Sequence, residues 1–235
     1  MRSLATTLPT PVPLFDVIAT YELARRSLRA PDFEAERRAA NTLAQTLLTS
    51  PRSFLPKLAD VALDLCRAHS AGISLLEGNA GKPVLRWRAL SGKLAPYLGR
   101  TLPRAFSPCS SVLDRDALQL MSRPARHFRH IEGLSPGIEE ALSIPFHVNR
   151  RPLGTLWVVA HDQARRFDAE DARLITGLAE FAAAALKVLT SLRQFRANVT
   201  ERGKVADLAV VSPARAERPT GSDAEPCPVS QARNG

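Results

Sequence analysis

Residues 141–195 decide the fold; they read ALSIPFHVNRRPLGTLWVVAHDQARRFDAEDARLITGLAEFAAAALKVLTSLRQF. From Leu142 to Val148, large apolar side chains recur at every second position, which is the period of a strand with one buried face. Residues 149–152 follow with the polar and proline chemistry of a turn. The almost unbroken apolar run at 153–160 then predicts a central strand that is covered on both faces.

A long helix is predicted to follow these strands. Asp168 is a good N-cap, and the carboxylates of Glu170 and Asp171 favour the positive end of the helix dipole. Apolar side chains then recur at spacings of four and three over about three heptads, and a lone helix cannot bury such a seam. The seam consists of Leu174, Leu178, Phe181, Ala185, Val188, Leu192 and Phe195.

The preceding part of the chain has a second set of regular patterns. Residues 53–68 carry apolar side chains at helical spacing, and residues 71–77 and 85–89 alternate as two strands of a hairpin. The glycine-containing segment 78–81 has the conformational freedom of the turn between them.

The two ends of the chain have different compositions. Residues 1–13 are polar and proline-rich, and they are predicted to be disordered. Residues 14–50 have the pattern of an N-terminal helical segment. The tail at 200–235 is rich in proline and glycine with balanced charge, which predicts disorder.

Residues 91–140, between the two hairpins, are called the lid here. They contain five prolines and little periodicity, and so long an irregular segment inside a compact domain usually serves a function. Within the lid, residues 118–121 are the best candidate for a strand, and residues 124–129 for a short helical turn.

Three successive features resemble the C-terminal half of a GAF domain. They are the strand 142–148, the RPLGTLWVVAH strand with Gly154, and the helix entry around Phe167. The helix and hairpin at 53–89 resemble the beginning of that domain, so the resemblance covers about residues 53–192. GAF domains are small sensory modules of histidine kinases, phosphodiesterases and transcription regulators. They bind different small molecules, and some bind none.

The resemblance and the patterns together predict an α+β fold of the GAF/PAS-like type. We expect a central antiparallel sheet of five to six strands, with helices on both sides and long N- and C-terminal helices. The GAF-like domain is expected to span residues 53–195. The resemblance also implies that the lid covers a pocket on one face of the sheet.

Composition narrows the class of protein. The net charge is +9, but the basic residues are scattered singly or in pairs, and a nucleic-acid reader more often has a dense basic stripe. We read no apolar run approaching the 18–20 residues of a membrane helix, and the N-terminus lacks the apolar block of a secretory signal. Three cysteines without metal-like spacing are consistent with reduced thiols in a cytoplasmic protein. Nucleic acid and membrane are therefore not expected as partners.

Cys109 and Ser110 lie in the most suggestive local motif, FSPCSSVL at residues 106–113. It resembles the C-[GS]-x-[VA]-L run that, in one group of GAF domains, opens a helix lining the pocket. Ser107 is placed to cap that helix, and a thiol in the first helical turn has its pKa lowered by the helix dipole. Two interpretations stay open: a ligand-contacting or redox-sensitive thiol, and a small residue packed under the lid.

Other polar and aromatic residues complete the tentative ligand-binding set. The lid segment around residue 127 has the chemistry to hold an anion, or to form a solvated loop face. The histidine of the strand at 142–148 is a candidate for the pocket floor, although it can equally face solvent or a helix. The two tryptophans are either core residues or stacking platforms. The set is Cys109, Ser110, Arg126, His127, Phe128, His147, Trp87 and Trp157.

Enzyme motifs are absent from the sequence. It has no G-x-S-x-G elbow, no phosphate-binding glycine loop and no H-E-x-x-H. The five histidines show no metal-ligand spacing, so neither catalytic nor metal-binding residues are predicted, and a cofactor is left undefined.

The resulting hypothesis is a stand-alone sensory or regulatory module of signal transduction, such as a two-component system. A small molecule or a redox change would act in the pocket under the lid, and the signal would leave through the C-terminal helix of a homodimer. A histidine kinase or response regulator is a possible partner. The alternative is a ligand-free dimerisation or interaction module that acts on a kinase or regulator in trans. A redox enzyme that depends on Cys109 is a third reading.

Overall fold

The computed structural model describes residues 11–78 and 83–210. Contacts divide the chain into two units, Met1–Leu192 and Arg193–Gly235. All the strands belong to the first unit, and the second contains the C-terminal part of the last helix.

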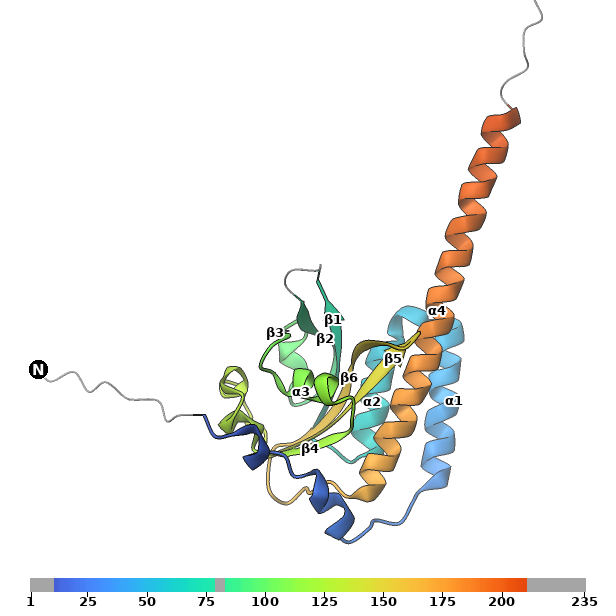
Figure 1. Cartoon of the computed structure of the whole chain (residues 1–235). Helices are drawn as coiled ribbons and strands as arrows, with labels where there is room; N and C mark the ends of the chain where they lie inside the picture. Colours follow the sequence, from blue (N-terminus) through green and yellow to red (C-terminus); the bar gives the residue numbers. More distant parts are fainter. Residues whose placement is uncertain (1–10, 79–82, 211–235) are drawn as a thin grey trace, which may run out of the picture. The chain divides into compact units, whose positions relative to one another are not determined.

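Six antiparallel strands form one sheet in the order β3-β2-β1-β6-β5-β4 (Figure 1). β6 lies between β1 and β5 and is buried along most of its length, so the prediction of a central strand is confirmed. The strands are β1 (Ser70–Glu77), β2 (Val84–Gly92), β3 (Thr101–Pro103), β4 (Gln119–Ser122), β5 (Glu140–Val148) and β6 (Arg151–Ala160).

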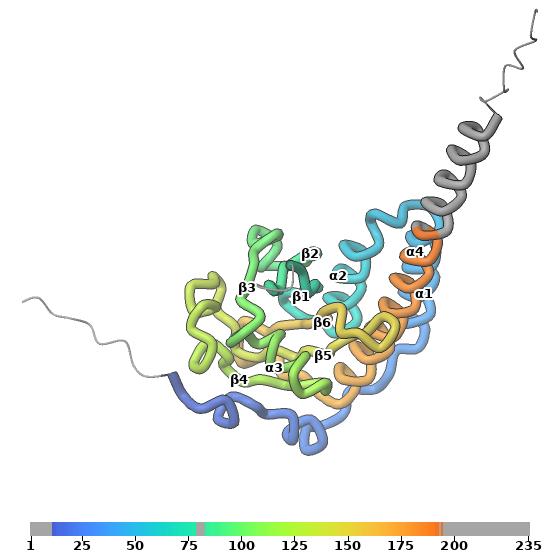
Figure 2. The backbone as a smooth tube through the Cα atoms, turned by 45° about the horizontal axis from the view of Figure 1, so that its top comes forward, coloured from blue at the N-terminus to red at the C-terminus, as the bar shows by residue number. Residues whose placement is uncertain are grey.

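Helices cover both faces of this sheet, as Figures 1 and 2 show. α1, α2 and α4 pack on one face, called the helix side, whereas α3 and short 3-10 turns pack on the other, called the lid side. The α-helices are α1 (Phe33–Thr49), α2 (Phe54–Leu65), α3 (Pro108–Arg115) and α4 (Ala169–Val210). The 3-10 turns are η1 (Leu14–Asp16), η2 (Thr20–Arg25), η3 (Pro51–Ser53), η4 (Ala95–Tyr97), η5 (Pro124–Arg126) and η6 (Arg129–Ile131). The predicted fold class, an α+β fold with a six-stranded antiparallel sheet, is confirmed.

Local chemistry explains how the C-terminal half of the sheet forms. Asn149 and Arg150 both have positive φ, at 53° and 61°, as a two-residue hairpin turn with the twist of its strands requires. Gly154 brings β6 against β1 so closely that a Cβ there would lie 2.0 Å from the carbonyl oxygen of Ser74. The backbone approach therefore requires glycine at this position.

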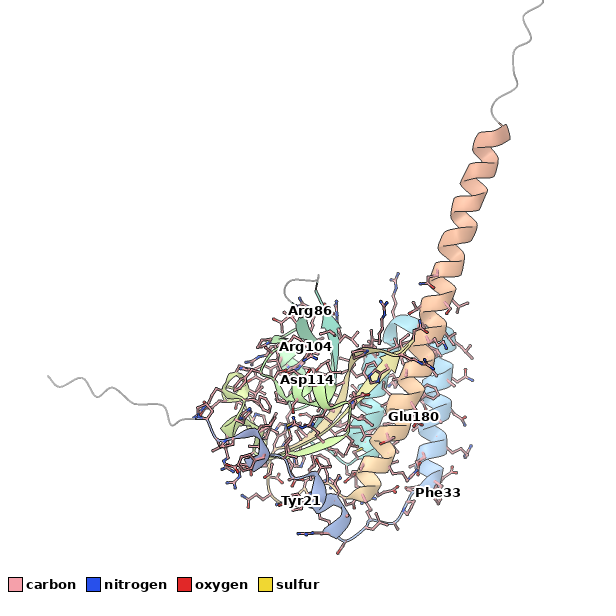
Figure 3. The ribbon with its side chains drawn as sticks, viewed as in Figure 1. Tyr21, Phe33, Arg86, Arg104, Asp114 and Glu180 are labelled. Carbon is pink, nitrogen blue, oxygen red and sulfur yellow. The ribbon has the colours of Figure 1, made fainter. Side chains whose placement is uncertain are left out.

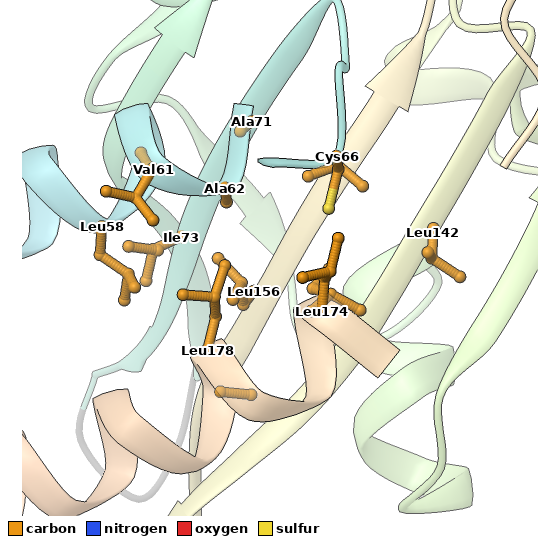
Figure 4. Packing of buried hydrophobic residues seen from close by; sticks show 14 of the residues in the cluster. Leu58, Val61, Ala62, Cys66, Ala71, Ile73, Leu142, Leu156, Leu174 and Leu178 are labelled. Atoms are coloured by element: carbon orange, nitrogen blue, oxygen red, sulfur yellow. The ribbon is translucent and has the colours of Figure 1, made fainter. Parts of the chain in front are cut away.

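The helix-side core joins the sheet to α2 and α4 (Figure 4). Leu58 of α2, Ile73 of β1, Leu156 of β6 and Ile175 of α4 are fully buried in it. On the lid side, alternate residues of the same strands form a separate core with α3 and the 3-10 turns. Both faces of the sheet are thus covered, and the sheet separates the helix-side core from the lid-side core.

The apolar seam of α4 divides into two parts. Leu174, Leu178 and Ala185 are buried in the helix-side core, so the domain itself covers the first half of the seam. Val188 and Leu192 are about half exposed. The domain core buries the first half of the seam, and the second half remains exposed on α4.

The helix also continues further than the sequence indicated. α4 ends at Val210, so the predicted disordered tail from residue 200 is wrong for residues 200–210, and residues 211–235 lie outside the described residues. The expected disorder of residues 1–13 likewise falls mainly on undescribed residues, 1–10. α4 begins at Ala169, and Asp168 caps it as predicted. The carboxylate of Asp168 accepts the backbone N–H of Asp171 at 3.0 Å.

One described helical segment, Ala169–Leu192, is long and apolar enough to cross a membrane by length and composition. This differs from the reading of the sequence, in which no segment approached that requirement. About a third of the segment's apolar window is buried inside the domain, and the core helix of a soluble protein passes the same test.

The chain before α1 lies along the outer edge of the sheet (Figures 1 and 2). Ile18 forms a β-bridge with Met121, the backbone N–H of Ala19 donates to the carbonyl of Leu120, and that of Ser122 donates to the carbonyl of Val17. This N-terminal segment, residues 17–19, therefore occupies the edge of β4.

Two buried carboxylates connect this region to the start of α4. Glu140 accepts from Arg26 at 2.7 Å and lies 2.7 Å from the guanidinium of Arg166. Asp171 is fully buried and pairs with Arg29 at 2.8 Å and Arg165 at 2.6 Å. Burial raises the pKa of Asp171 even though the adjacent guanidinium of Arg165 lowers it.

We predict that Gly154→Ala destabilises the protein by about 1–3 kcal/mol, because the new methyl group would overlap the backbone of β1. Gly177→Ala is the matched control. Gly177 is exposed on α4 with open space around it, so its replacement should raise the free energy of unfolding by up to about 1 kcal/mol through helix propensity. Urea denaturation measures both, and equal effects of the two substitutions would contradict the close packing of β6 on β1.

Candidate functional site

The lid packs over one face of the sheet, and a small cavity remains beneath it. The volume of this lid-side cavity is about 30 Å³. Since a buried water needs roughly 10–15 Å³ by a comparable measure, the space suits one or two waters. None of the lining residues is charged; they are Trp87, Leu102, Pro108, Cys109, Pro124, Ile131, Ile138, Ala141, Ser143, Trp157 and Val159.

Cys109 lies at this cavity in the first turn of α3. Ser107 caps the helix as predicted: it accepts the backbone N–H of Ser110 at 3.1 Å, and Ser110 Oγ accepts that of Ser107 at 2.7 Å. The predicted low pKa of the thiol is wrong. Burial raises the pKa of Cys109, and its contact with the hydroxyl of Ser74 offsets only part of that effect. The structure thus contains a neutral thiol packed under the lid.

Ser74 connects the polar atoms beneath the lid. Its hydroxyl lies 3.4 Å from the sulfur of Cys109 and accepts the indole N–H of Trp157 at 2.9 Å. Sequence reasoning missed Ser74; the available signal was a lone hydroxyl in the apolar strand GISLL, on the side opposite Ile73.

The two tryptophans are both core residues and cavity lining. Their rings lie 5.3 Å apart with 54° between the ring planes, and each is 4% exposed. The indole N–H of Trp87 is buried and has no hydrogen-bond partner within the described part of the chain. A buried donor without an acceptor is uncommon, so this group is available to a ligand or water.

The predicted anion-binding cluster around residue 127 does not assemble. Arg126 is exposed, and the ring of His127 donates from Nδ1 to the carbonyl of Val12 at 2.6 Å. Phe128 is buried in the lid-side core. His127 and Phe128 therefore hold the lid and the N-terminal segment in place, and neither they nor Arg126 lines the cavity.

His147, a candidate for the pocket floor, is not among the residues that line the lid-side cavity. His147 lines an open groove of about 390 Å³ beside α4, and its Nε2 lies 3.0 Å from Asp116. Glu180, labelled on α4 in Figure 3, lines the same groove.

A second open groove, of about 380 Å³, lies between α1 and α4. Phe33 of α1, labelled in Figure 3, is exposed at one end, where the guanidinium of Arg173 lies over its ring. Arg173 also pairs with Glu170 and Glu36. Leu43 and Phe181 line the groove further along. Unlike the lid-side cavity, both grooves have charged residues in their lining.

A metal centre is not formed by the residues the structure describes. No group of three or more His, Cys, Asp or Glu side chains among them is arranged to hold a metal ion. The candidate site is the lid-side cavity, whose lining includes two tryptophans, the hydroxyl of Ser143 and an apolar surface.

The family comparison and the structural comparison agree. The model of the GAF domain family matches residues 49–187, and no curated protein matches the chain. The GAF-B domain of DevS from Mycobacterium smegmatis has a similar structure, with a TM-score of 0.51 and 22% identity, over 62% of this chain and 99% of that one. The GAF domain of a phosphoenolpyruvate-protein phosphotransferase from Coxiella burnetii matches with a TM-score of 0.54 and 14% identity, over 71% and 99%.

A third similar structure belongs to an enzyme. Free methionine-R-sulfoxide reductase from Neisseria meningitidis, solved in complex with its substrate, matches with a TM-score of 0.53 and 18% identity, over 68% of this chain and 93% of that one. At these identities the structures establish the fold alone, whereas the family match covers more than half of the chain. The chain belongs to the GAF domain family, whose members are small-molecule-binding sensory and regulatory modules.

Proposed function

We propose that this chain is a stand-alone sensory module of signal transduction, with the lid-side cavity as its sensing site and α4 as its output. The observation that carries this proposal is the unpartnered indole N–H of Trp87, which is buried beside a cavity in a fold built to bind small molecules. The module is proposed to act in the cytoplasm, without catalysis, on a histidine kinase or response regulator.

The lining of the cavity favours a neutral ligand. An ion that moves from water into an apolar site loses its hydration, and no charged side chain lines this cavity to compensate. The Trp87 N–H would donate to an acceptor atom such as a carbonyl oxygen. A cyclic nucleotide or another anion fits these surroundings poorly.

Ligand entry requires the lid to move, because a volume of about 30 Å³ holds only a water or two. A ligand changes the balance between closed and open lids only by its difference in affinity for them. A signal therefore requires a ligand that binds the open arrangement better.

The exposed part of the α4 seam supports an output through a homodimer. Val188 and Leu192 lie four residues apart on α4, and about half of each side chain is exposed. Apolar residues at this spacing on an exposed helix face are typical of a helix–helix interface.

The small volume of the cavity favours a second candidate function, a ligand-free module that works through dimerisation or through binding a kinase or regulator in trans. In that case the lid-side core is only a support for the sheet, and Trp87 donates to water. The dimer interface would then carry the whole function.

To test the sensing site, we predict that protein purified from its own host carries a neutral small molecule, seen as an added mass by native mass spectrometry. Ala141→Leu fills the lid-side cavity and should remove that mass. Ala117→Leu, in the exposed groove beside α4, makes the same change in side chain and should keep it. If neither wild type nor the control carries any mass, the ligand-free function is the correct one; a mass retained in Ala141→Leu would place the ligand elsewhere.

To test the output, we predict that the wild-type chain sediments as a dimer at micromolar concentration and that the double variant Val188→Glu, Leu192→Glu sediments as a monomer. The introduced carboxylates would repel one another and lose hydration in the interface. Leu98→Glu, at an equally exposed position in the lid, should leave the dimer intact. A monomeric wild-type chain would remove both the dimer and the proposed route of the signal.

The redox reading of Cys109 is tested by thiol accessibility. In a Cys227→Ser background, the buried thiols of Cys66 and Cys109 should react with Ellman's reagent at least about tenfold more slowly in native protein than in urea, because reaction requires local opening. Reduction of free methionine sulfoxide by the wild type, lost in Cys109→Ser, would instead establish an enzyme.

A further inference from the structure

His161, the first residue after β6, lies where both ends of the lid meet the sheet. Its Nδ1 is 2.7 Å from the carbonyl oxygen of Gly137, near the end of the lid. Its Nε2 is 2.8 Å from the hydroxyl of Ser70, the first residue of β1. The same hydroxyl accepts the backbone N–H of Leu94 at 3.0 Å, near the start of the lid. One imidazole and one serine thus connect residues 94 and 137.

The partners fix the protonation state of this ring. A carbonyl oxygen only accepts, so Nδ1 of His161 carries a proton and donates it to Gly137. In the neutral ring Nε2 is then an acceptor, and it takes the hydroxyl proton of Ser70. The oxygen of Ser70 remains free to accept the N–H of Leu94. Every group in this chain of hydrogen bonds is satisfied when His161 is neutral.

We propose that His161 is a pH-sensitive latch, which holds the two ends of the lid against the sheet while it is neutral and releases them when it is protonated. Protonation converts Nε2 into a donor, so the fully buried Ser70 must accept both from it and from Leu94. The hydroxyl proton of Ser70 then loses its acceptor, and a buried donor without a partner costs about 1–3 kcal/mol.

The surroundings of His161 also oppose a positive charge on its ring. Burial lowers the pKa of His161 most, and the nearby His69 and Lys93 lower it further, whereas the Gly137 carbonyl and the carboxylate of Asp162 raise it. The ring of His69 is stacked 6.0 Å away, and its Nδ1 accepts the backbone N–H of His161 at 2.9 Å. These groups come from the loop before β1, the segment after β2 and the turn after β6, around a ring that is itself only half-buried.

The direction of the pH dependence follows from this lowered pKa. When the lid opens, His161 is exposed to water and regains an ordinary value of about 6.5. The open form then binds the proton more tightly than the latched form. The latch is therefore fully effective above about pH 6.5, and it weakens as the pH falls from there through the lower pKa of the latched state.

The first test measures the wild-type chain by NMR between pH 7.5 and pH 5. We expect His161 to titrate below 6.5 with its proton on Nδ1. We expect the amide hydrogen of Leu94 to exchange faster with solvent as the pH falls, after correction for the intrinsic exchange rate. Its protection factor should fall by about tenfold for each unit that separates the pKa values of the latched and open states. Titration of His161 at or above 6.5, or protection of Leu94 that does not change with pH, would overturn the latch.

Variants then separate the latch from a general effect of acid. His161→Gln, which does not titrate, should remove the pH dependence at Leu94, whereas Ser70→Ala should remove the protection at every pH. His147→Gln, at a histidine that pairs with Asp116 in the groove beside α4, is the control and should keep the wild-type profile. A pH dependence that persists in His161→Gln would assign it to another group. If His161→Gln does not fold, the wild-type titration decides alone.

Discussion

The pairing of two buried carboxylates with arginines is the constraint on which the arrangement of this domain depends. Asp171 and Glu140 are almost inaccessible to water, and each lies between two guanidinium groups. Loss of both partners would leave an uncompensated charge in the interior, so the pairing favours the arrangement that keeps the guanidinium groups in place. The four arginines come from the segments before α1 and before α4, so the ion pairs join those segments to β5 and α4.

Away from these ion pairs, the two faces of the sheet carry cores of different composition. On the helix side, long helices and large aliphatic residues form a continuous core. On the lid side, hydroxyl, thiol and indole groups lie among the apolar residues, and one indole donor has no partner among residues 11–78 and 83–210. The lid consists of short elements, β3, β4, α3 and 3-10 turns, joined by irregular segments, which open at lower cost than long helices and central strands.

Local patterns were enough to predict the parts of the fold that local chemistry decides. Hydrophobic period, the N-cap at Asp168 and the capping serine at Ser107 gave β6, α4 and α3. What they could not give depends on non-local packing. The groove that His147 lines is formed by β5, α4 and the segment after α3, and the raised pKa of the Cys109 thiol follows from burial that outweighs the helix dipole.

The place of the N-terminal segment along β4 has a consequence for handling this protein. A fragment trimmed to residues 49–187, the part that the family match covers, lacks the chain that hydrogen-bonds to Leu120 and Ser122. Its outer strand would offer unpaired N–H and carbonyl groups, and such an edge is a template for strand addition between molecules. Aggregation of the trimmed domain would then report an uncovered edge, and a solubility screen should begin with chains that retain residues 11–29.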